Sequence, residues 1–415
     1  MTMFHNFKPD WKQGVEETLT YTTQIFRTQS GKEIRESRRF IPRWRFKFQM
    51  HVNRDGLAAL YRMLMTRREE TIIFPAPTIS GRASVNFAIG ATTITFTARP
   101  AWVKAGRRIE INGNHYTISS LSGANSIVLG EALVKAVVAG DTIRLVIEGR
   151  LQAVQEVNWI TNRIAVADIE LSAVYDQFVP HAFNAADYAF VKEMPYMEYF
   201  PNWREPVAVN IDSERQTFET ETGPETYFYP GEPAARYIKF VSTFKRQDLV
   251  HQAMGFFNGQ RGRARSFWHY LPVSEMIVAA AVTSTATSIV ITGLGHPIKT
   301  DSAAYGNVYV YFVLRDGTFF EKTVTAVNEG ATNTTLILDS SFGRAISAAD
   351  FVEVLPVLQC RFTEDEMTVN WYTDAVAEIA VNLKVIDQDN SPRISPLTQT
   401  QNYMANADDS PFPTT

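Results

Sequence analysis

The sequence has almost no cysteine, and this absence removes whole classes of structure. Cys360 is the one cysteine among 415 residues, so no internal disulfide framework and no cysteine-based zinc or iron–sulfur site can form. It lies in the apolar run VLPVLQCRF, which predicts a strand with a buried, inert thiol. A chain without disulfides is suited to assembly in a reducing cytoplasm.

Long apolar runs and an excess of charge of one sign are also missing. No segment reaches the roughly 18 consecutive apolar residues of a membrane span, so we expect a soluble chain without one. The N-terminal stretch MTMFHNFKPDWKQG lacks the apolar core of a secretory signal, so we expect no export by that route. The 40 basic and 44 acidic residues give a net charge of −4, unlike a general nucleic-acid binder. Any contact with DNA is therefore expected to be local.

Signatures of catalysis and of cofactor binding are absent from the sequence as well. There is no Walker loop, GxGxxG, HExxH, GxSxG or Asp-rich calcium loop. The seven histidines are scattered, and none has a histidine or cysteine at ligand spacing. The densest carboxylate run, 363–366 (TEDE), is interpreted as solvated loop charge rather than an acid–base pair. We predict no enzyme activity, no metal and no cofactor.

What the sequence does contain is an internal repeat. Trp11, followed by Val15, recurs as Trp203, followed by Val207. Each is followed by a polar, Thr-rich stretch with a Ser-Gly or Thr-Gly turn signal. These stretches are candidates for hairpins that reach a neighbour or line a tube, with an ordinary surface hairpin as the alternative. The triplet Val-Asn-Trp also occurs twice, at 157–159 and 369–371.

The repeat extends through a strand, a helix and a set of short β-type runs. PRWRFKFQMHV and RYIKFVSTF alternate apolar and polar residues, which predicts half-buried strands. Apolar residues at helical spacing follow, from Arg54 and from Arg246. Residues 80–148 and 280–356 then hold short β-type runs separated by turn residues. The sequence therefore predicts a mainly β fold in two tandem units, each with one helix and an inserted small β-barrel or sandwich.

The predicted segments follow from these boundaries. They are 1–79 (first unit, N-terminal part), 80–150 (first inserted β module), 151–190 (first unit, C-terminal strands), 191–275 (second unit, N-terminal part), 276–356 (second inserted β module), 357–390 (second unit, C-terminal strands) and 391–415 (flexible tail).

Two groups of residues are candidates for contacts and architecture. Basic runs are interpreted as subunit contacts, because arginine is enriched at interfaces, with phosphate contact in a DNA lumen or lipid headgroup contact as alternatives. The candidates are Arg38, Arg39, Arg43, Arg45, Arg67, Arg68, Arg261, Arg263 and Arg265.

Aromatic residues make up 12% of the chain and are interpreted mainly as packing residues. The architectural candidates are Trp11, Trp44, Phe46, Trp159, Trp203, Phe240, Phe256, Phe257, Phe267, Trp268 and Trp371.

These motifs resemble those of the distal tail proteins of long-tailed bacteriophages and of related gene transfer agents. In the second unit the resemblance rests on Trp203, Phe240, Phe244, Leu249, Phe256, Phe257, Arg261, Gly262, Arg263, Phe267 and Trp268. The first unit retains Trp11, Trp44, Phe46, Leu57, Leu60 and the pair Arg67–Arg68. It lacks the Gly-Arg pair and the final tryptophan, and the resemblance covers about seventy residues per unit.

The resemblance implies a tail-tube-like β-fold that assembles into a ring at the distal end of a phage tail. Such a ring joins the tail tube to the baseplate or tip, and DNA passes transiently and without specificity through its lumen. Family members carry one unit and form six-membered rings, whereas this chain carries two. A homotrimer with pseudo-sixfold symmetry is favoured, and a homohexamer stays open.

The implied partners are further copies of the chain, the tail tube protein, and tail hub, fibre or receptor-binding proteins. The implied location is the virion tail tip, after assembly in the host cytoplasm. The inserted modules are expected on the outside of the ring, where they could hold fibres. The alternatives from other classes are a glycan-binding adhesin built of β modules, because surface aromatics stack on sugars, and a glycan-degrading enzyme, for which no carboxylate pair stands out.

Overall fold

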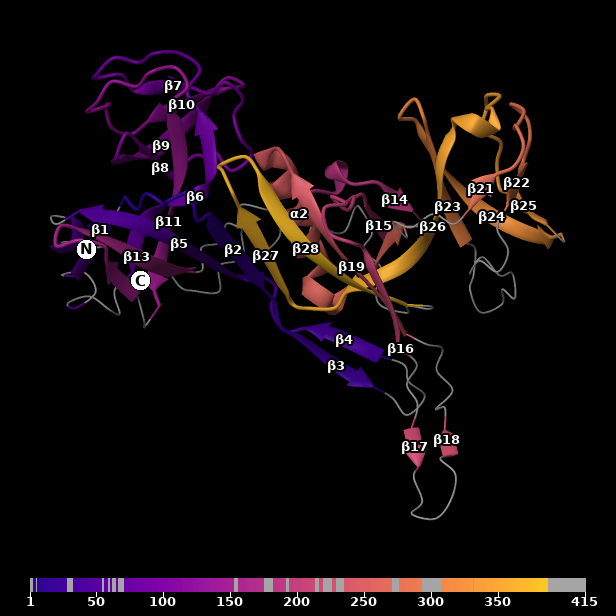
Figure 1. Cartoon of the computed structure of the whole chain (residues 1–415). Coiled ribbons are helices and arrows are strands. Elements are labelled where there is room, and N and C mark those ends of the chain that lie inside the picture. Colours follow the sequence, from indigo (N-terminus) through magenta and orange to yellow (C-terminus); the bar gives the residue numbers. More distant parts are fainter. Residues whose placement is uncertain are drawn as a thin grey trace, which may run out of the picture.

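The computed structural model describes most of the chain as strands in large antiparallel sheets (Figure 1). The described residues are 3–4, 6–27, 33–53, 56–58, 60–61, 65, 71–152, 156–174, 182–191, 194–212, 216–218, 226–228, 235–270, 276–292, 308–330 and 332–386. The predicted mainly β fold with few helices is confirmed. No helix in this described part is long and apolar enough to cross a membrane. The tail predicted at 391–415 and Arg67 and Arg68 lie outside the described residues.

The first repeat is built from strands β1 to β13. Their bounds are β1 (Met3–Phe4), β2 (Val15–Thr20), β3 (Thr23–Arg27), β4 (Glu33–Ser37), β5 (Arg43–Asn53), β6 (Ile72–Arg82), β7 (Thr93–Thr95), β8 (Arg108–Ile111), β9 (Asn114–Ser122), β10 (Ser126–Leu129), β11 (Thr142–Leu151), β12 (Glu156–Trp159) and β13 (Ile164–Ala173). β1 runs parallel to β6, and the antiparallel pairs β6–β11, β11–β13 and β13–β5 follow. β2 pairs with β5, and β12 with β13.

The second repeat is built from strands β15 to β28, after the short β14. Their bounds are β14 (Phe190–Val191), β15 (Met194–Met197), β16 (Ala208–Asp212), β17 (Gln216–Phe218), β18 (Thr226–Phe228), β19 (Ala235–Phe244), β20 (Phe267–Tyr270), β21 (Ile277–Val278), β22 (Ser288–Thr292), β23 (Val308–Leu314), β24 (Phe319–Glu329), β25 (Asn333–Leu338), β26 (Phe351–Phe362), β27 (Glu366–Trp371) and β28 (Ala377–Val385). β15 runs parallel to β20, and the antiparallel pairs β20–β26, β26–β28 and β28–β19 follow. β16 pairs with β19, and β27 with β28.

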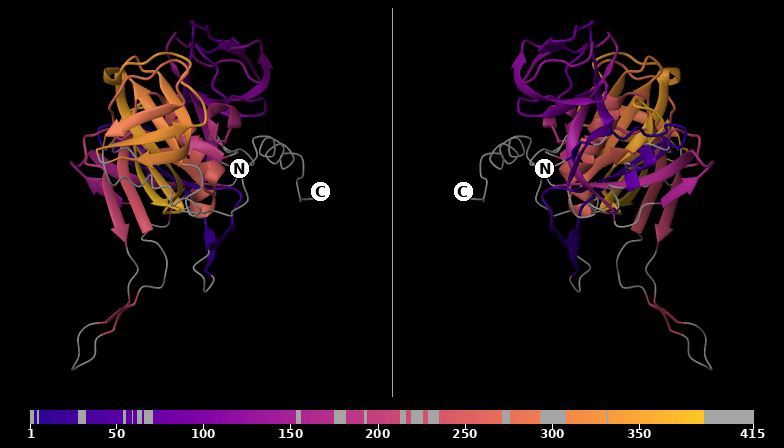
Figure 2. Two further views of the ribbon diagram at one scale, coloured as in Figure 1. Left: turned by 90° about the vertical axis from the view of Figure 1, so that its right-hand side faces the viewer. Right: turned by 90° about the vertical axis from the view of Figure 1, so that its left-hand side faces the viewer.

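The two repeats therefore share one strand-pairing scheme. β1, β2, β5, β6, β11, β12 and β13 correspond in turn to β15, β16, β19, β20, β26, β27 and β28. The register agrees at the level of single residues: Val157 pairs with Ala167, and its counterpart Val369 pairs with Ile379. The hairpins β3–β4 and β17–β18 also correspond, and both project on the same side of the molecule (Figures 1 and 2).

Each repeat carries its extra strands between the helix and the last strands, where the sequence predicts inserted modules. β7 to β10 pack with the outer halves of β6 and β11, and Ile94, Ile109 and Ile118 are buried there. β21 to β25 enclose a separate core around Ile289, Phe312 and Leu336. β6, β11 and β26 run on from repeat to insert, so the insertions are extensions of the same strands.

One long helix, α2 (Gln247–Gln260), packs on the second repeat. Val250, Ala253, Met254, Phe256 and Phe257 are buried on it, and the helix ends at Arg261, which adopts a left-handed conformation. Residues 56–58, 60–61 and 65 are helical at the corresponding place in the first repeat. The short 3-10 turns are η1 (Ala185–Asp187), η2 (Gly262–Ala264) and η3 (Ala348–Asp350).

Candidate functional site: the junction between the repeats

Strand β2 joins the sheets of the two repeats. It pairs with β5 of its own repeat on one side and with β27 of the second repeat on the other. The antiparallel β2–β27 register runs from Val15 opposite Trp371 to Thr20 opposite Glu366. The result is one continuous strand order across the chain, β12, β13, β5, β2, β27, β28, β19 and β16.

The two faces of this joined sheet differ in polarity. Because side chains alternate along a strand, every second residue of β2 and β27 shares a face. Val15, Leu19, Val369 and Trp371 are buried on one face, where His251 of α2 lies 6.0 Å from Trp371 between ring centroids. The opposite face is polar. The side chains that alternate onto the same face as Thr18 are Arg43, Arg45, Lys47, Thr368, Glu378, Asn382 and Lys384.

A buried carboxylate, Glu17, lies at the centre of the junction. Its Oε1 accepts a hydrogen bond from Trp44 Nε1 at 2.8 Å, and its Oε2 accepts from Thr78 Oγ1 at 2.6 Å and from Trp371 Nε1 at 2.9 Å. Glu17 has no solvent exposure, so these three donors stand in for water around the carboxylate. Since Trp371 belongs to the second repeat, Glu17 fixes the two repeats to each other.

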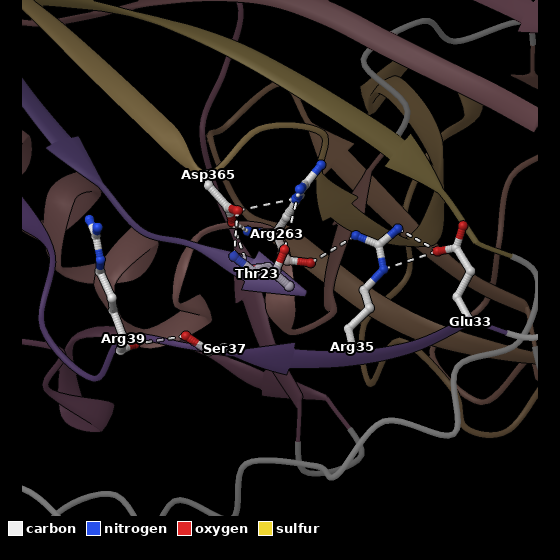
Figure 3. A network of polar contacts seen from close by, with 7 residues as sticks. All are labelled: Thr23, Glu33, Arg35, Ser37, Arg39, Arg263 and Asp365. Carbon is white, nitrogen blue, oxygen red and sulfur yellow. Dashed lines mark hydrogen bonds and ion pairs between the residues drawn. The ribbon is translucent and has the colours of Figure 1, made fainter. Parts of the chain in front are cut away.

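The hairpin β3–β4 of the first repeat docks on the second repeat through Arg263 and Asp365 (Figure 3). Asp365 Oδ2 accepts from the Thr23 backbone N–H at 2.7 Å and from Arg263 Nε at 3.2 Å. Its Oδ1 accepts from Thr23 Oγ1 at 2.7 Å and from the Arg263 N–H at 3.1 Å. The Arg263 carbonyl oxygen in turn accepts from Arg35 of β4 at 3.0 Å. This arginine therefore joins repeats within one chain.

A second ion cluster holds the same hairpin at Glu33. Its carboxylate pairs with Arg35 beside it and with two cations of the second repeat, Arg361 at 3.8 Å and Lys384 at 3.6 Å. Burial lowers the pKa of Arg35 from its usual value, and its hydrogen bond to Glu33 opposes that shift. The side chains of Arg35, Arg361 and Glu33 are all largely buried, which makes the ion cluster part of a sealed interface.

The other candidate arginines have different surroundings. Arg43 and Arg45 lie on β5 and face the polar side of the joined sheet. Arg261 lies over the ring of Phe40, 4.8 Å from its centroid, and Arg265 donates to the Gly259 carbonyl at 3.2 Å. Arg38 is exposed after β4, and the Arg39 carbonyl accepts from Ser37 Oγ at 2.7 Å.

Most of the architectural aromatic candidates lie in the core. Phe46, Phe240, Phe256, Phe257, Phe267 and Trp371 are buried. Trp11 and Trp44 are half-buried against the same core, and the half-buried Trp268 packs on Tyr309 with ring centroids 5.0 Å apart. Trp159 and Trp203 differ, because they are 51% and 61% exposed. Trp159 is the counterpart of Trp371, so the tryptophan of the same triplet is buried in one repeat and exposed in the other.

Sequence reasoning missed the acidic residues of the junction. Glu17 stands at an inward position of an alternating strand, which is the one local signal that a buried carboxylate leaves. Asp365 belongs to the run interpreted as solvated loop charge, and that interpretation is wrong for this residue, whose side chain is 15% exposed and bonded to two residues. Nothing in the local pattern of Glu33 separates it from a surface charge.

The described residues include no group of three or more histidine, cysteine, aspartate or glutamate side chains placed to hold a metal ion. Cys360 is buried, as predicted, and burial raises the pKa of its thiol, which keeps it protonated. An open hollow of about 820 Å³ lies between Trp11 and the first inserted module, bordered by Glu110 and Arg144, which pair with each other at 3.2 Å.

Comparisons with known proteins add little to this geometry. No protein-family model and no curated protein matches the chain. Among solved structures, that of the infectious bursal disease virus Gx strain aligns with 12% identity over 81% of this chain and 78% of that chain. Its TM-score is 0.07, so the alignment carries no argument about fold or function.

Proposed function

We propose that the protein is a non-catalytic structural virion protein that forms a ring at the distal end of a phage tail. The ring joins the tail tube to the baseplate or tip and surrounds the DNA channel. The tail tube protein binds one side of it, and hub, fibre or receptor-binding proteins bind the other or the inserted modules. The protein is assembled in the host cytoplasm and resides at the tail tip.

The observation that carries the proposal is the head-to-tail contact between the repeats. β2 of the first repeat meets β27 of the second, rather than its own counterpart β16. Such a contact is heterologous, and units joined in this way continue until they close into a ring or form a filament. Each repeat thus behaves as one unit of a ring, and three chains supply six units.

The character of the joined sheet also supports the proposal. The helix α2 lies on its apolar face, so the polar face with Arg43, Arg45 and Lys47 is free of that helix. A mixed polar surface of this kind suits the lining of a channel through which DNA slides, because it offers contacts to phosphates without the strong field of a basic groove.

Electron microscopy and particle labelling test the proposal. Negatively stained full-length protein should show rings with six-unit or threefold appearance, and antibody against the chain should label the tips of phage tails. A monodisperse monomer of 46.8 kDa at high concentration, together with unlabelled particles, would overturn it.

A further inference from the structure

Two strand edges of the joined sheet have no partner among the described strands. β12 pairs with β13 alone, and β16 pairs with β19 alone. They lie at opposite ends of the strand order, β12 in the first repeat and β16 in the second. All five residues of β16 are exposed. Unpaired edges of this kind present free backbone N–H and C=O groups to another chain.

The two open edges correspond to the two strands that meet at the internal junction. Glu16 of β2 lies opposite Lys47, and Ala208 of β16 lies opposite Lys239, the counterpart of Lys47. β16 is therefore the second repeat's β2. Likewise, β12 pairs with β13 in the same register in which β27 pairs with β28. β12 therefore corresponds in the first repeat to β27 in the second.

We propose that β16 of one copy pairs antiparallel with β12 of the next copy, in the register of the internal β2–β27 junction. The partner is a second copy of this chain, and the inference rests on the proposed ring. The internal pairs Glu16–Asn370, Glu17–Val369 and Thr18–Thr368 translate into three pairs between copies. These are Ala208 with Asn158, Val209 with Val157, and Asn210 with Glu156.

The side chains along the open edges fit burial by such a partner. In the internal junction, Leu19 and Trp371 are 1% and 0% exposed. Their counterparts Ile211 and Trp159 are 69% and 51% exposed, and both have kept large apolar side chains. The counterpart of Glu17 is Val209, 38% exposed, so the junction between copies is apolar where the internal one holds a carboxylate.

The projecting hairpin of the second repeat fits the same arrangement. Gln216 pairs with Phe228 in β17–β18 as Gln24 pairs with Glu36 in β3–β4, so the two hairpins share one register. The hairpin β3–β4 covers Arg361, which is buried. The counterpart of Arg361 in the first repeat is Arg150, which is exposed. The segment around β17 and β18 is rich in acidic residues, which complements this open arginine.

The geometry of a closed sheet matches the proposed channel. Three copies contribute eight strands each, which makes 24 strands, and at roughly 4.8 Å per strand with the usual tilt the barrel is on the order of 40–50 Å across. The polar face lines its inside, since α2 packs on the other face. Such a channel leaves room for a nucleic-acid duplex along its axis.

Disulfide trapping tests the register. Asn210→Cys combined with Glu156→Cys should convert the 46.8-kDa chain into covalent dimers and trimers on a non-reducing gel, ending at about 140 kDa for three copies. A bond within one chain is excluded by distance, because seven strand spacings, roughly 34 Å, separate the two edges. Native Cys360 is buried, so the wild-type chain should stay monomeric on the gel.

Two variants serve as matched controls. Thr18→Cys with Thr368→Cys occupies the equivalent internal pair, where the two hydroxyls are 3.5 Å apart, and should close within the chain without a gain in mass. Asn210→Cys with Val157→Cys puts the thiols on opposite faces and should give less than a tenth of the cross-linking of the predicted pair.

The outcomes separate the junction from the ring. Rings in the microscope with cross-linking of the predicted pair support both proposals. Rings without that cross-link, or with equal cross-linking of the opposite-face pair, overturn the β16–β12 junction and leave the ring intact. Monomers that neither form rings nor cross-link, while the internal control closes, overturn both.

Discussion

Trp371 donates a hydrogen bond from Nε1 to Glu17 Oε2 at 2.9 Å, although 354 positions separate the two residues along the chain. The bond crosses from the second repeat to the first, between the paired strands β27 and β2. It makes the stability of the junction depend on one buried carboxylate, and it distinguishes this junction from the open edges, where Val209 takes the place of Glu17.

Replacing Glu17 by glutamine should destabilise the fold. The amide keeps the shape, but its NH₂ group then faces the N–H or O–H donors of Trp44, Thr78 and Trp371, and at least one donor loses its acceptor. We expect a loss of about 1.5–3 kcal/mol in the free energy of unfolding, measured in urea. Glu16→Gln, on the polar face, is the control and should change it by less than about 0.5 kcal/mol. Equal stability of the two variants would contradict the role of Glu17.

Asp365→Ala should release the hairpin β3–β4. The substitution removes the acceptor of four hydrogen bonds from Thr23 and Arg263, and we expect a loss of roughly 2–3 kcal/mol. Amide exchange in residues 23–27 and 33–37 should become faster than in the rest of the sheet. Glu364→Ala is the control from the same acidic run, since Glu364 is exposed and accepts one bond of 3.4 Å from Asn382. Exchange that rises equally in both variants would count against the docking role.

Gly14→Ala should strain the entry to β2. Gly14 has a φ of +78°, and a Cβ there would lie 2.7 Å from the Trp371 carbonyl oxygen. The matched control is Gly90→Ala, with a φ of +89° and nothing within 4 Å of the added Cβ. Placing alanine in this left-handed conformation should lower the free energy of unfolding by about 1–2 kcal/mol in both variants. Any further decrease in Gly14→Ala therefore measures the close contact with Trp371 across the junction. Equal melting temperatures of the two variants would contradict a cost from the contact between residue 14 and the Trp371 carbonyl oxygen.

Acid should destabilise the protein through His269. This histidine is fully buried, which lowers its pKa to about 4, and its Nδ1 lies 3.0 Å from the Met197 carbonyl oxygen. Because the folded pKa lies below the unfolded value of about 6.5, the unfolded chain binds the proton first. Stability from this site is present above pH 6.5 and falls as the pH drops towards 4, by roughly 3 kcal/mol in all.

The measurement is the urea unfolding free energy at pH 7 and at pH 4.5. His269→Phe should reduce the difference between the two pH values, whatever its cost at pH 7, because phenylalanine does not titrate. A pH dependence that survives intact in His269→Phe would assign the acid sensitivity to other groups.

The mainly β character, the internal repeat and the burial of Cys360 follow from local patterns in the sequence. Alternation such as that of Phe46 and Phe48 on β5 is a local property, and so are the turn residues that end the strands. The repeat was visible because each unit keeps the same Trp, Val-Asn-Trp and hairpin positions at nearly constant spacing. These features can be predicted without knowing which strand lies beside each residue in the sheet.

Which strand edges meet depends on the packing of the whole chain. The pairing of β2 with β27 joins residues far apart in sequence, and strand pairing of that kind leaves no local pattern. For the same reason the sequence did not separate Asp365 from its solvated neighbour Glu364, or the buried Trp371 from the exposed Trp159. Trp371 and Asp365 are covered by strands of the other repeat, β2 and β3, whereas β12, which carries Trp159, pairs only with β13 of its own repeat among the described strands.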